Sequence, residues 1–257
     1  METPLSDRSR EIILGSMLGD GSLRIHKPYK NARFSFRHSI HQEEYFWWKV
    51  SELKEISSDH AVWRQGTGGK DGWGGEKLRY QSRALESLTD LYRLTHKKEV
   101  RGKMQIRRSW LNTLTPLSLA VWWLDDGSLV GDTRQGVFCT DGFSLDEVKI
   151  LDRYMKKVWN VGTSIGQVQH KDQYRLWMRS TENLQAFLRI ILPHIPVASM
   201  LQKILLLYID SQLQQRWISE IVHLSTFSEE IVLEQLAVKR AKWKKFRKSY
   251  SPICIVI

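Results

Sequence analysis

Residues 13–23 read ILGSMLGDGSL, and residues 119–129 read LAVWWLDDGSL. Each stretch is an apolar segment that ends in an acid, Asp20 in the first and Asp126 in the second, and continues with Gly and Ser. A single Asp-Gly-Ser sequence is a common way to end a helix and turn the chain. Two of them at equivalent places, 106 residues apart and each behind an apolar segment, indicate an internal repeat.

The chain downstream of each copy alternates between apolar and polar residues. Residues 32–40 read ARFSFRHSI, residues 77–83 read KLRYQSR, and residues 173–179 read QYRLWMR. Alternation with period two is the pattern of a half-buried strand, here with one apolar face and one basic, hydrogen-bonding face. Such strands fit antiparallel sheets that are covered on one side and open on the other.

Helical spacing separates the predicted strands. Apolar residues recur every three or four positions over residues 145–158, behind Ser144 as the N-cap and Glu147 as the second member of a capping box. Helices are also predicted over residues 41–56, 84–95 and 181–192, and the glycine-rich residues 66–75 predict a hairpin tip between two strands. We therefore predict an α+β fold of two pseudo-symmetric αββαββα repeats, residues 1–112 and 113–225, followed by a basic helix or tail at 226–257.

The composition excludes several classes of protein. Two cysteines in 257 residues are too few for a disulfide framework, and no apolar run is long enough for a signal peptide or a membrane span. This predicts a soluble intracellular protein, of an organellar matrix or a prokaryotic cytoplasm. The formal charge of +11 favours a polyanionic partner and is uneven: residues 24–110 carry +9 and residues 239–257 carry +7, whereas residues 111–238 carry −3.

The acids at the ends of the two apolar segments need a positive partner. A carboxylate at a helix C-terminus is disfavoured by about 0.3–1 kcal/mol, because that end carries partial negative charge. Gly15 and Gly19 would let the two helices approach closely and bring their ends together. Two neighbouring carboxylates repel, so one tends to protonate unless a divalent cation lies between them. Oxygen ligands of this kind predict magnesium, or manganese in its place.

Both copies resemble the paired motifs of the LAGLIDADG homing endonucleases, in the single-chain form with two repeats. The second copy has Val121 where the family often has a small residue, which predicts looser or asymmetric helix packing there. The resemblance implies saddle-shaped sheets along the major groove of a long, asymmetric double-stranded DNA site. It also implies a monomeric endonuclease that cuts both strands, with Asp20 and Asp126 as metal ligands and the backbone carbonyls of Gly19 and Asp125 as additional ones.

The same branch of the family carries a lysine after the last helix of each repeat, near the active site. The resemblance assigns this place to Lys98 in the first repeat, with Lys97 or Lys103 as alternatives, and to Lys203 in the second. Lys98 and Lys203 are 105 residues apart, nearly the separation of the two aspartates. An ammonium group there would help to activate the attacking water and offset charge in the transition state.

Residues on the open faces of the predicted strands are candidates for DNA contact. They are Arg33, Arg37, Lys77, Arg79, Arg83, Arg175, Trp177 and Arg179. His38 falls on the apolar side of its strand and is predicted to be a core residue with satisfied polar atoms, and the other tryptophans are predicted to be core residues. No Cys/His spacing predicts a zinc site.

Two alternative functions stay open. An RNA maturase that assists intron splicing could use the same fold, with intron RNA as its partner and the basic residues 239–257 as a second nucleic-acid surface. A non-catalytic DNA-binding protein is disfavoured, because it would have no need of acids at both helix ends. Competition between DNA and intron RNA tests the first alternative, and magnesium-dependent nicking tests the second.

Overall fold

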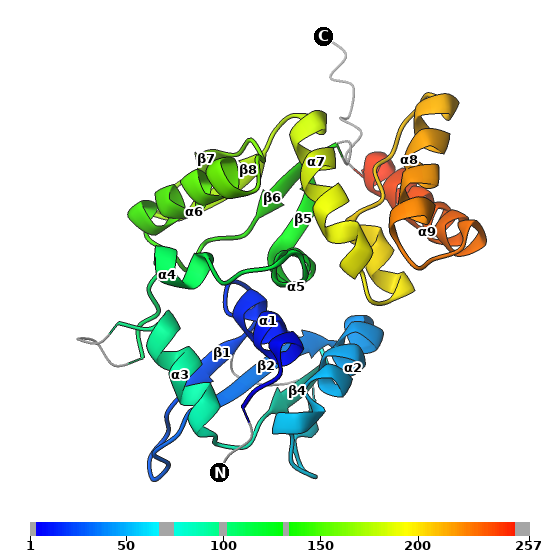
Figure 1. Cartoon of the computed structure of the whole chain (residues 1–257). Coiled ribbons are helices and arrows are strands. Elements are labelled where there is room, and N and C mark those ends of the chain that lie inside the picture. The colour runs from blue at the N-terminus through cyan, green and yellow to red at the C-terminus, as the bar shows by residue number, and fades with distance from the viewer. Residues whose placement is uncertain (1–3, 67–74, 98–101, 131–133, 250–257) are drawn as a thin grey trace.

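The chain folds into two halves that meet along a pair of central helices. A computed structural model describes residues 4–66, 75–97, 102–130 and 134–249, with side chains as far as residue 243. Figure 1 shows the two halves one above the other, with α1 (Asp7–Ser16) and α5 (Pro116–Asp126) packed together between them. Within the described ranges, no helix is long and apolar enough to cross a membrane.

Each half contains a four-stranded antiparallel sheet, and the strand order is the same in both. In the first half, β1 (Ser22–Arg24) pairs with β2 (Arg33–Ser39), β2 with β4 (Lys77–Gln81), and β4 with β3 (Val62–Gln65). The order β5-β6-β8-β7 in the second half is built from β5 (Gly127–Val130), β6 (Gln135–Phe138), β7 (Ser164–Gln167) and β8 (Tyr174–Met178). The glycine-rich segment joins the antiparallel strands β3 and β4, although residues 67–74 lie outside the described ranges.

The helices of the two halves also follow one order. After α1, the first half has η1 (Ile40–Gln42), α2 (Glu43–Glu52), η2 (Lys54–Ile56) and α3 (Glu86–Thr95). The short α4 (Arg108–Leu111) connects the halves, and the second half has α5, α6 (Leu145–Val158), α7 (Thr181–Ile191), η3 (Leu192–His194) and η4 (Ala198–Lys203). The predicted α+β fold of two αββαββα repeats is confirmed, and α6 begins with the predicted capping box of Ser144 and Glu147.

The strand alternation sets which face of each sheet is covered. Phe36 of β2 and Tyr80 of β4 are buried and stacked on each other, whereas their neighbours Arg37 and Arg79 pair across the strands on the open face. The strand predicted over residues 77–83 ends at Gln81. It ends early because the backbone N–H of Arg83 leaves the sheet and donates to the carbonyl of Ile56 in η2, at 2.9 Å.

The central helices approach each other at glycines, as the sequence predicts. A Cβ atom on Gly15 would lie 2.3 Å from the backbone oxygen of Ser118, and one on Gly19 would lie 2.5 Å from Cβ of Asp125. Any other residue would therefore force α1 and α5 apart at these two positions. Val121, the counterpart of Gly15 in the second repeat, is fully buried.

The two motif helices end differently. α5 runs through to Asp126, whereas α1 stops at Ser16 and continues as a tight turn that carries Asp20. The N–H groups of Gly19 and Gly21 both donate to the carbonyl of Ser16, at 2.9 and 2.7 Å, and close this turn. Glycine is a poor helix former, which favours this early stop.

Two further helices follow the αββαββα elements of the second half, and the first of them lies within residues 113–225, the range predicted for the second repeat. α8 (Ser211–Leu224) and α9 (Glu229–Ser249) pack against each other, and α9 also packs against η4 (Figure 1). Their buried residues Trp217, Ile221 and Leu236 belong to the same hydrophobic core as α5. The helix pair is thus joined to the second half through the segment that contains Lys203.

Candidate active site

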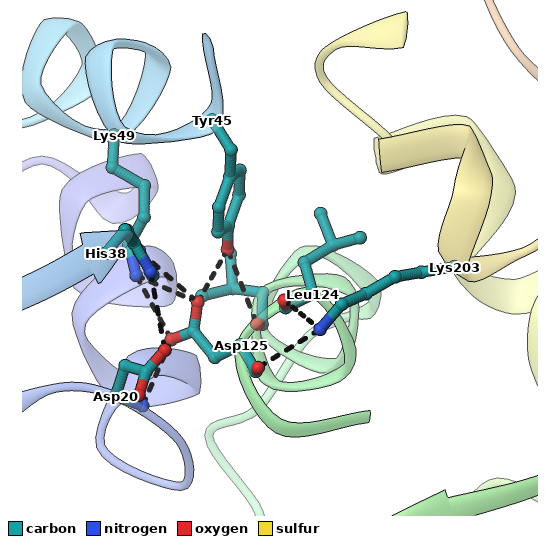
Figure 2. Close-up of polar contacts among 8 residues, drawn as sticks. Asp20, His38, Tyr45, Lys49, Leu124, Asp125 and Lys203 are labelled. Atoms are coloured by element: carbon teal, nitrogen blue, oxygen red, sulfur yellow. Dashed lines mark hydrogen bonds and ion pairs between the residues drawn. The ribbon is translucent and has the colours of Figure 1, made fainter. Parts of the chain in front are cut away.

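The side chain of Asp125 crosses from the second repeat into the first. Its carboxylate is fully buried and accepts a hydrogen bond from the hydroxyl of Tyr45 at 2.9 Å. Nζ of Lys49 lies 3.1 Å from each of its two oxygens (Figure 2). Tyr45 and Lys49 are four residues apart on α2 and therefore share one helix face. The result is a fully buried ion pair that joins the two repeats.

Asp20 lies beside this ion pair. Its backbone N–H donates to Oδ2 of Asp125 at 3.4 Å, and its own side chain is 39% exposed. Burial alone would raise the pKa of Asp20, but the adjacent His38, followed by the charges of Lys49 and Lys203, outweighs burial and lowers the pKa below its usual value. Asp20 is therefore ionised at neutral pH.

His38 lies between the two acids. Its imidazole is fully buried, with Nδ1 3.4 Å from Oδ2 of Asp20 and Nε2 3.8 Å from Oδ1 of Asp125 (Figure 2). Neither ring nitrogen has a hydrogen bond of acceptable geometry, so both contacts are electrostatic. The prediction that His38 is buried is confirmed, but the prediction that its polar atoms are satisfied is wrong. Strand alternation reveals burial and does not reveal which groups from another repeat lie opposite.

These residues form a cluster of possible metal ligands. Ligand atoms of Asp20, His38 and Asp125 lie within 4.8 Å of one another. The ammonium of Lys49 is already bound to both oxygens of Asp125, so a cation on that carboxylate would be repelled. Among the described residues, no lysine donates a hydrogen bond to the carboxylates of Asp20 or Asp126, and Asp126 is not a member of this cluster.

Asp126 has the opposite electrostatic environment to Asp20. Burial, and after it the negative charges of Asp20 and Asp125, raise its pKa to about 7, although Lys203 acts in the other direction. Without a cation, this carboxyl group is thus partly protonated at neutral pH. The sequence argument that one of two neighbouring acids tends to protonate agrees with this value.

Lys203 binds the end of the motif helix α5. Its Nζ donates to the backbone carbonyls of Leu124, at 2.6 Å, and Asp125, at 3.1 Å (Figure 2). The last carbonyls of a helix have no partners within the helix and carry partial negative charge, so an ammonium group complements them. Burial lowers the pKa of Lys203, while Asp125, Asp20 and Asp126 oppose the shift.

The remaining residues predicted for the active site are Gly19, the carbonyl of Asp125, and Lys98 with its alternatives Lys97 and Lys103. The carbonyl of Asp125, predicted to bind metal, accepts the hydrogen bond from Lys203, and Gly19 packs against the Asp125 side chain. Lys98 lies outside the described residues. Of its two alternatives, the N–H of Lys97 donates to the carbonyl of Lys103 at 2.9 Å, on either side of the segment that is not described. The catalytic and ligand roles of these residues stay predictions.

The open face of the first sheet carries four of the eight predicted DNA-contact residues. Arg33, Arg37, Lys77 and Arg79 lie on β2 and β4, whereas Arg83 lies beyond β4 and donates to the carbonyl of Glu55 at 2.7 Å. A hollow of about 400 Å³ on this face connects the sheet to the acid site. Its lining includes Asp20, Arg24, Arg37, Trp63 and Arg79.

The open face of the second sheet is less available. Arg175 makes two hydrogen bonds to the carboxylate of Asp141, at 2.8 and 2.6 Å, which neutralise its charge. The guanidinium of Arg179 lies over the ring of Trp177, 4.8 Å from its centroid. The predicted contact residues are thus present on this sheet, but one of them already has an acidic partner.

Sequence reasoning missed the residues that hold the site together. Lys49 and Tyr45 occupy the apolar face of a predicted helix, and a lysine on such a face is a signal that a buried acid lies opposite. Trp63 and Trp47 were predicted to be core residues, and that prediction is wrong, because they are 40% and 46% exposed. The strand β3, which carries Trp63, has only four residues and shows no clear alternation from which its open face could be recognised.

Comparison with known proteins identifies a family and a fold. The model of the LAGLIDADG DNA endonuclease family matches residues 10–187. Protein RecA of Mycobacterium gastri is 35% identical over 127 residues, which cover 48% of this chain and 27% of that protein. Cytochrome b mRNA maturase bI2 of Saccharomyces cerevisiae is 27% identical over 197 residues, covering 75% of this chain and 46% of the maturase. The chain thus spans less than half the length of either relative.

A solved structure has the same fold. The homing endonuclease I-WcaI, bound to its DNA recognition sequence, matches with a TM-score of 0.69 at 22% sequence identity. The match covers 80% of this chain and 90% of the I-WcaI chain.

Proposed function

This chain belongs to the LAGLIDADG DNA endonuclease family, and we propose that it is a site-specific endonuclease that hydrolyses both strands of a long, asymmetric DNA target. One arrangement carries the proposal: Asp20, on the turn that follows α1, and Asp126, the last residue of α5, lie between two sheets whose open faces present basic residues. I-WcaI, which shares the fold, is bound to its DNA recognition sequence, and we extend that mode of binding to this chain.

The open faces supply the DNA-binding surface. Arg37 and Arg79 pair across β2 and β4 near Asp20, where guanidinium groups can neutralise phosphates or bind base edges. Trp63 in the first half and Trp177 in the second add apolar area on the same faces. A DNA duplex that lies along both sheets would pass directly over the acid site.

The acids fit a magnesium ion. Asp20 is ionised and accessible, and the pKa of Asp126 is raised by burial and then by the negative charges of Asp20 and Asp125, which a divalent cation would offset. Oxygen donors of this kind suit magnesium. Bound there, the ion would supply a Lewis acid for the scissile phosphate and lower the pKa of the attacking water.

The remaining residues hold these acids in position. Lys203 binds the carbonyl end of α5 and so offsets negative charge directly behind Asp126. The ion pair of Lys49 with Asp125 fixes the backbone N–H of Asp20 against the second repeat. The two acids are therefore attached to one rigid unit and not to separate loops.

The test is a cleavage assay on selected DNA. A randomised duplex library, incubated with the protein and magnesium, should yield one enriched cleaved sequence. Asp20→Asn and Asp126→Asn should each suppress double-strand cleavage by about a thousandfold or more while binding changes little, because each removes a charged ligand for the metal. Asp146→Asn, at an exposed position of α6, is the matched control and should cleave normally. Absence of any magnesium-dependent cleavage would overturn the function, and full cleavage by both site variants would overturn the metal assignment.

A second candidate, RNA maturase, is favoured by one observation. The cytochrome b mRNA maturases bI2 of Saccharomyces cerevisiae and Debaryomyces hansenii match 75% and 78% of this chain. Binding of an intron RNA that competes with the selected DNA, together with faster splicing of that intron, would support this role. Splicing that is unaffected by the protein would count against it.

A further inference from the structure

The segment that follows Lys203 is buried without belonging to a sheet or helix. Residues 205–208 have no regular secondary structure, yet Leu205 and Leu206 are fully buried. Buried backbone N–H and C=O groups require hydrogen-bond partners. The N–H of Leu205 donates to the carbonyl of Leu201 at 3.0 Å, and side chains supply further partners for this segment.

Side chains of α8 supply these partners. Nε1 of Trp217 donates to the carbonyl of Ile204 at 3.2 Å, and Nε2 of Gln214 donates to the carbonyl of Leu206 at 3.1 Å. Oε1 of Gln214 accepts from the N–H of Tyr208 at 3.0 Å. One face of α8 thus binds alternate residues of the segment.

The next helix, α9, binds the residue immediately before Lys203. Nε2 of Gln202 donates to both the backbone oxygen and Oε1 of Gln235, at 2.8 and 2.9 Å. Nζ of Lys239 donates to the carbonyl of Gln202, and Lys239 is only 9% exposed. Among the described residues, no carboxylate lies within 4.0 Å of this ammonium. A buried ammonium without an acidic partner is destabilising, so an apolar residue would serve packing better.

Lys203 is also held from the side of the acid site. Its own carbonyl accepts from Nε1 of Trp123 at 3.0 Å, and its ammonium binds the end of α5. Lys203 therefore lies on a short bridge between α5, which carries Asp126, and α9. An ammonium on such a bridge keeps its position only if both ends are fixed.

We propose that Lys239 and Gln235 of α9 are positioning residues for Lys203, so that the helix pair beyond the two repeats controls the cleavage centre of the second repeat. The proposal rests on the proposed function for its consequence in catalysis. Its structural part, the immobilisation of Lys203, stands on the hydrogen bonds alone and has a test that requires no DNA.

The first test is amine labelling of the full chain with an N-hydroxysuccinimide acetate, followed by mass spectrometry. Lys239→Met should raise the labelling rate of Lys203 by about tenfold, because one hydrogen bond to a charged group is lost. Gln235→Ala, which keeps the lysine, should raise it in the same direction and covers the case in which Lys239→Met fails to fold. Lys49, buried in the first repeat, serves as the internal reference and should keep its labelling rate.

The matched control is Lys242→Met, the same substitution at an exposed position of the same helix. It should leave the labelling of Lys203 unchanged. Labelling of Lys203 that stays at the wild-type rate in both Lys239→Met and Gln235→Ala would overturn the proposal. So would an equal increase in the Lys242→Met control.

The second test measures the cleavage rate of each DNA strand separately, on the selected target. Lys239→Met should slow mainly the strand that Lys203→Met slows, so that nicked DNA accumulates. The double variant should be no slower than Lys203→Met alone, because both changes act through one group. Equal slowing of both strands, or fully additive effects, would contradict the proposal. If even the wild-type protein cuts no DNA, the proposed function fails while the labelling result still decides the positioning role.

Discussion

Asp20 and Asp126 occupy the same place in two copies of one motif, yet their surroundings give them opposite properties. Asp20 lies on a turn after a helix that has already ended, beside His38, and its pKa is lowered. Asp126 is the last residue of a continuous helix, and its pKa is raised to about 7 by burial and by the two neighbouring acids. A repeat in the sequence thus does not imply a repeat in electrostatics.

The difference originates at the residue just before each acid. In the first motif this residue is Gly19, which has no side chain, and in the second it is Asp125, which fills the space that Gly19 leaves. The side chain of Asp125 extends into the first repeat, where its carboxylate pairs with Lys49 and accepts a hydrogen bond from Tyr45. Its charge is therefore compensated by residues of the first repeat. Four experiments test this asymmetry.

The largest expected effect comes from removing the ammonium group of Lys49 in the first repeat. Lys49→Met should lower the free energy of unfolding by about 3–5 kcal/mol, because it leaves the buried Asp125 carboxylate unpaired. The matched control is Lys149→Met, which breaks an exposed pair with Asp146 and should cost about 0.5 kcal/mol or less. Urea unfolding followed by circular dichroism measures both. If Lys49→Met costs no more than the control, the crossed ion pair does not hold the repeats together.

The next effect concerns the close contact between the motif helices. Gly15→Ala places a Cβ 2.3 Å from the backbone of Ser118 and should cost about 1–3 kcal/mol, whereas Val121 at the equivalent position of the second repeat is accommodated. Gly66→Ala, which meets no atom within 4 Å, is the control and should be neutral. Thermal unfolding compares the two alanine variants. Equal unfolding midpoints for the two variants would show that α1 tolerates a side chain at position 15, as α5 does at Val121.

The two acids should respond to amidation with opposite signs. In metal-free buffer at pH 8, Asp126→Asn should stabilise the protein by about 1 kcal/mol, since a partly solvated carboxylate with a raised pKa is strained when ionised. Because the pKa of Asp126 is higher in the folded protein than its usual value near 3.8, protonated Asp126 stabilises the fold at low pH, and this stabilisation is lost as the pH rises through about 7. The stabilisation by Asp126→Asn should therefore be smaller at pH 5 than at pH 8. Asp20→Asn should instead destabilise at both pH values, because its lowered pKa makes ionisation favourable throughout this range.

Urea unfolding at pH 5 and pH 8 with a chelator present distinguishes these outcomes. Stabilisation by Asp20→Asn, or destabilisation by Asp126→Asn at pH 8, would contradict the electrostatic difference between the two motif ends.

The smallest effect compares the two open faces. Arg37→Gln should reduce the slope of log binding constant against log salt by about 0.9, the value for one phosphate contact. Arg175→Gln should reduce it by less than half as much, since Asp141 already neutralises that guanidinium. Fluorescence anisotropy with the selected duplex at several salt concentrations, in calcium to prevent cleavage, gives both slopes. Equal reductions would mean that Asp141 releases Arg175 on binding.

The sequence was sufficient for the fold because periodicity is local. Alternation in residues 32–40 and the capping box at Ser144 are each contained in a short stretch, and both are present in the structure. The close packing of α1 and α5 could also be predicted from the sequence, because Gly15 and Gly19 leave space for a second helix and the repeat supplies that helix.

The contacts between residues of the site could not be predicted from the sequence, because they join residues that are far apart in the chain. The contact of Asp125 with Lys49 joins positions 76 residues apart in different repeats, and no local pattern encodes such a pairing. Lys203 was assigned by resemblance, but its bonds to the end of α5, and the bond from Lys239 of α9 to the adjacent Gln202, join segments far apart in the chain. Lys98 lies outside the described residues, so its assignment stays a prediction.

The pairing of Gly19 with Asp125 has a consequence for how such a molecule can assemble. Two copies of the first half placed together would bring glycine opposite glycine and bury two Lys49 side chains without a carboxylate. Two copies of the second half would set Asp125 against Asp125, with overlapping side chains and like charges. Only the unlike pair is complementary. A chimera that combines one half of this chain with the other half of a relative would therefore fold only if it retains both the lysine at position 49 and the aspartate at position 125.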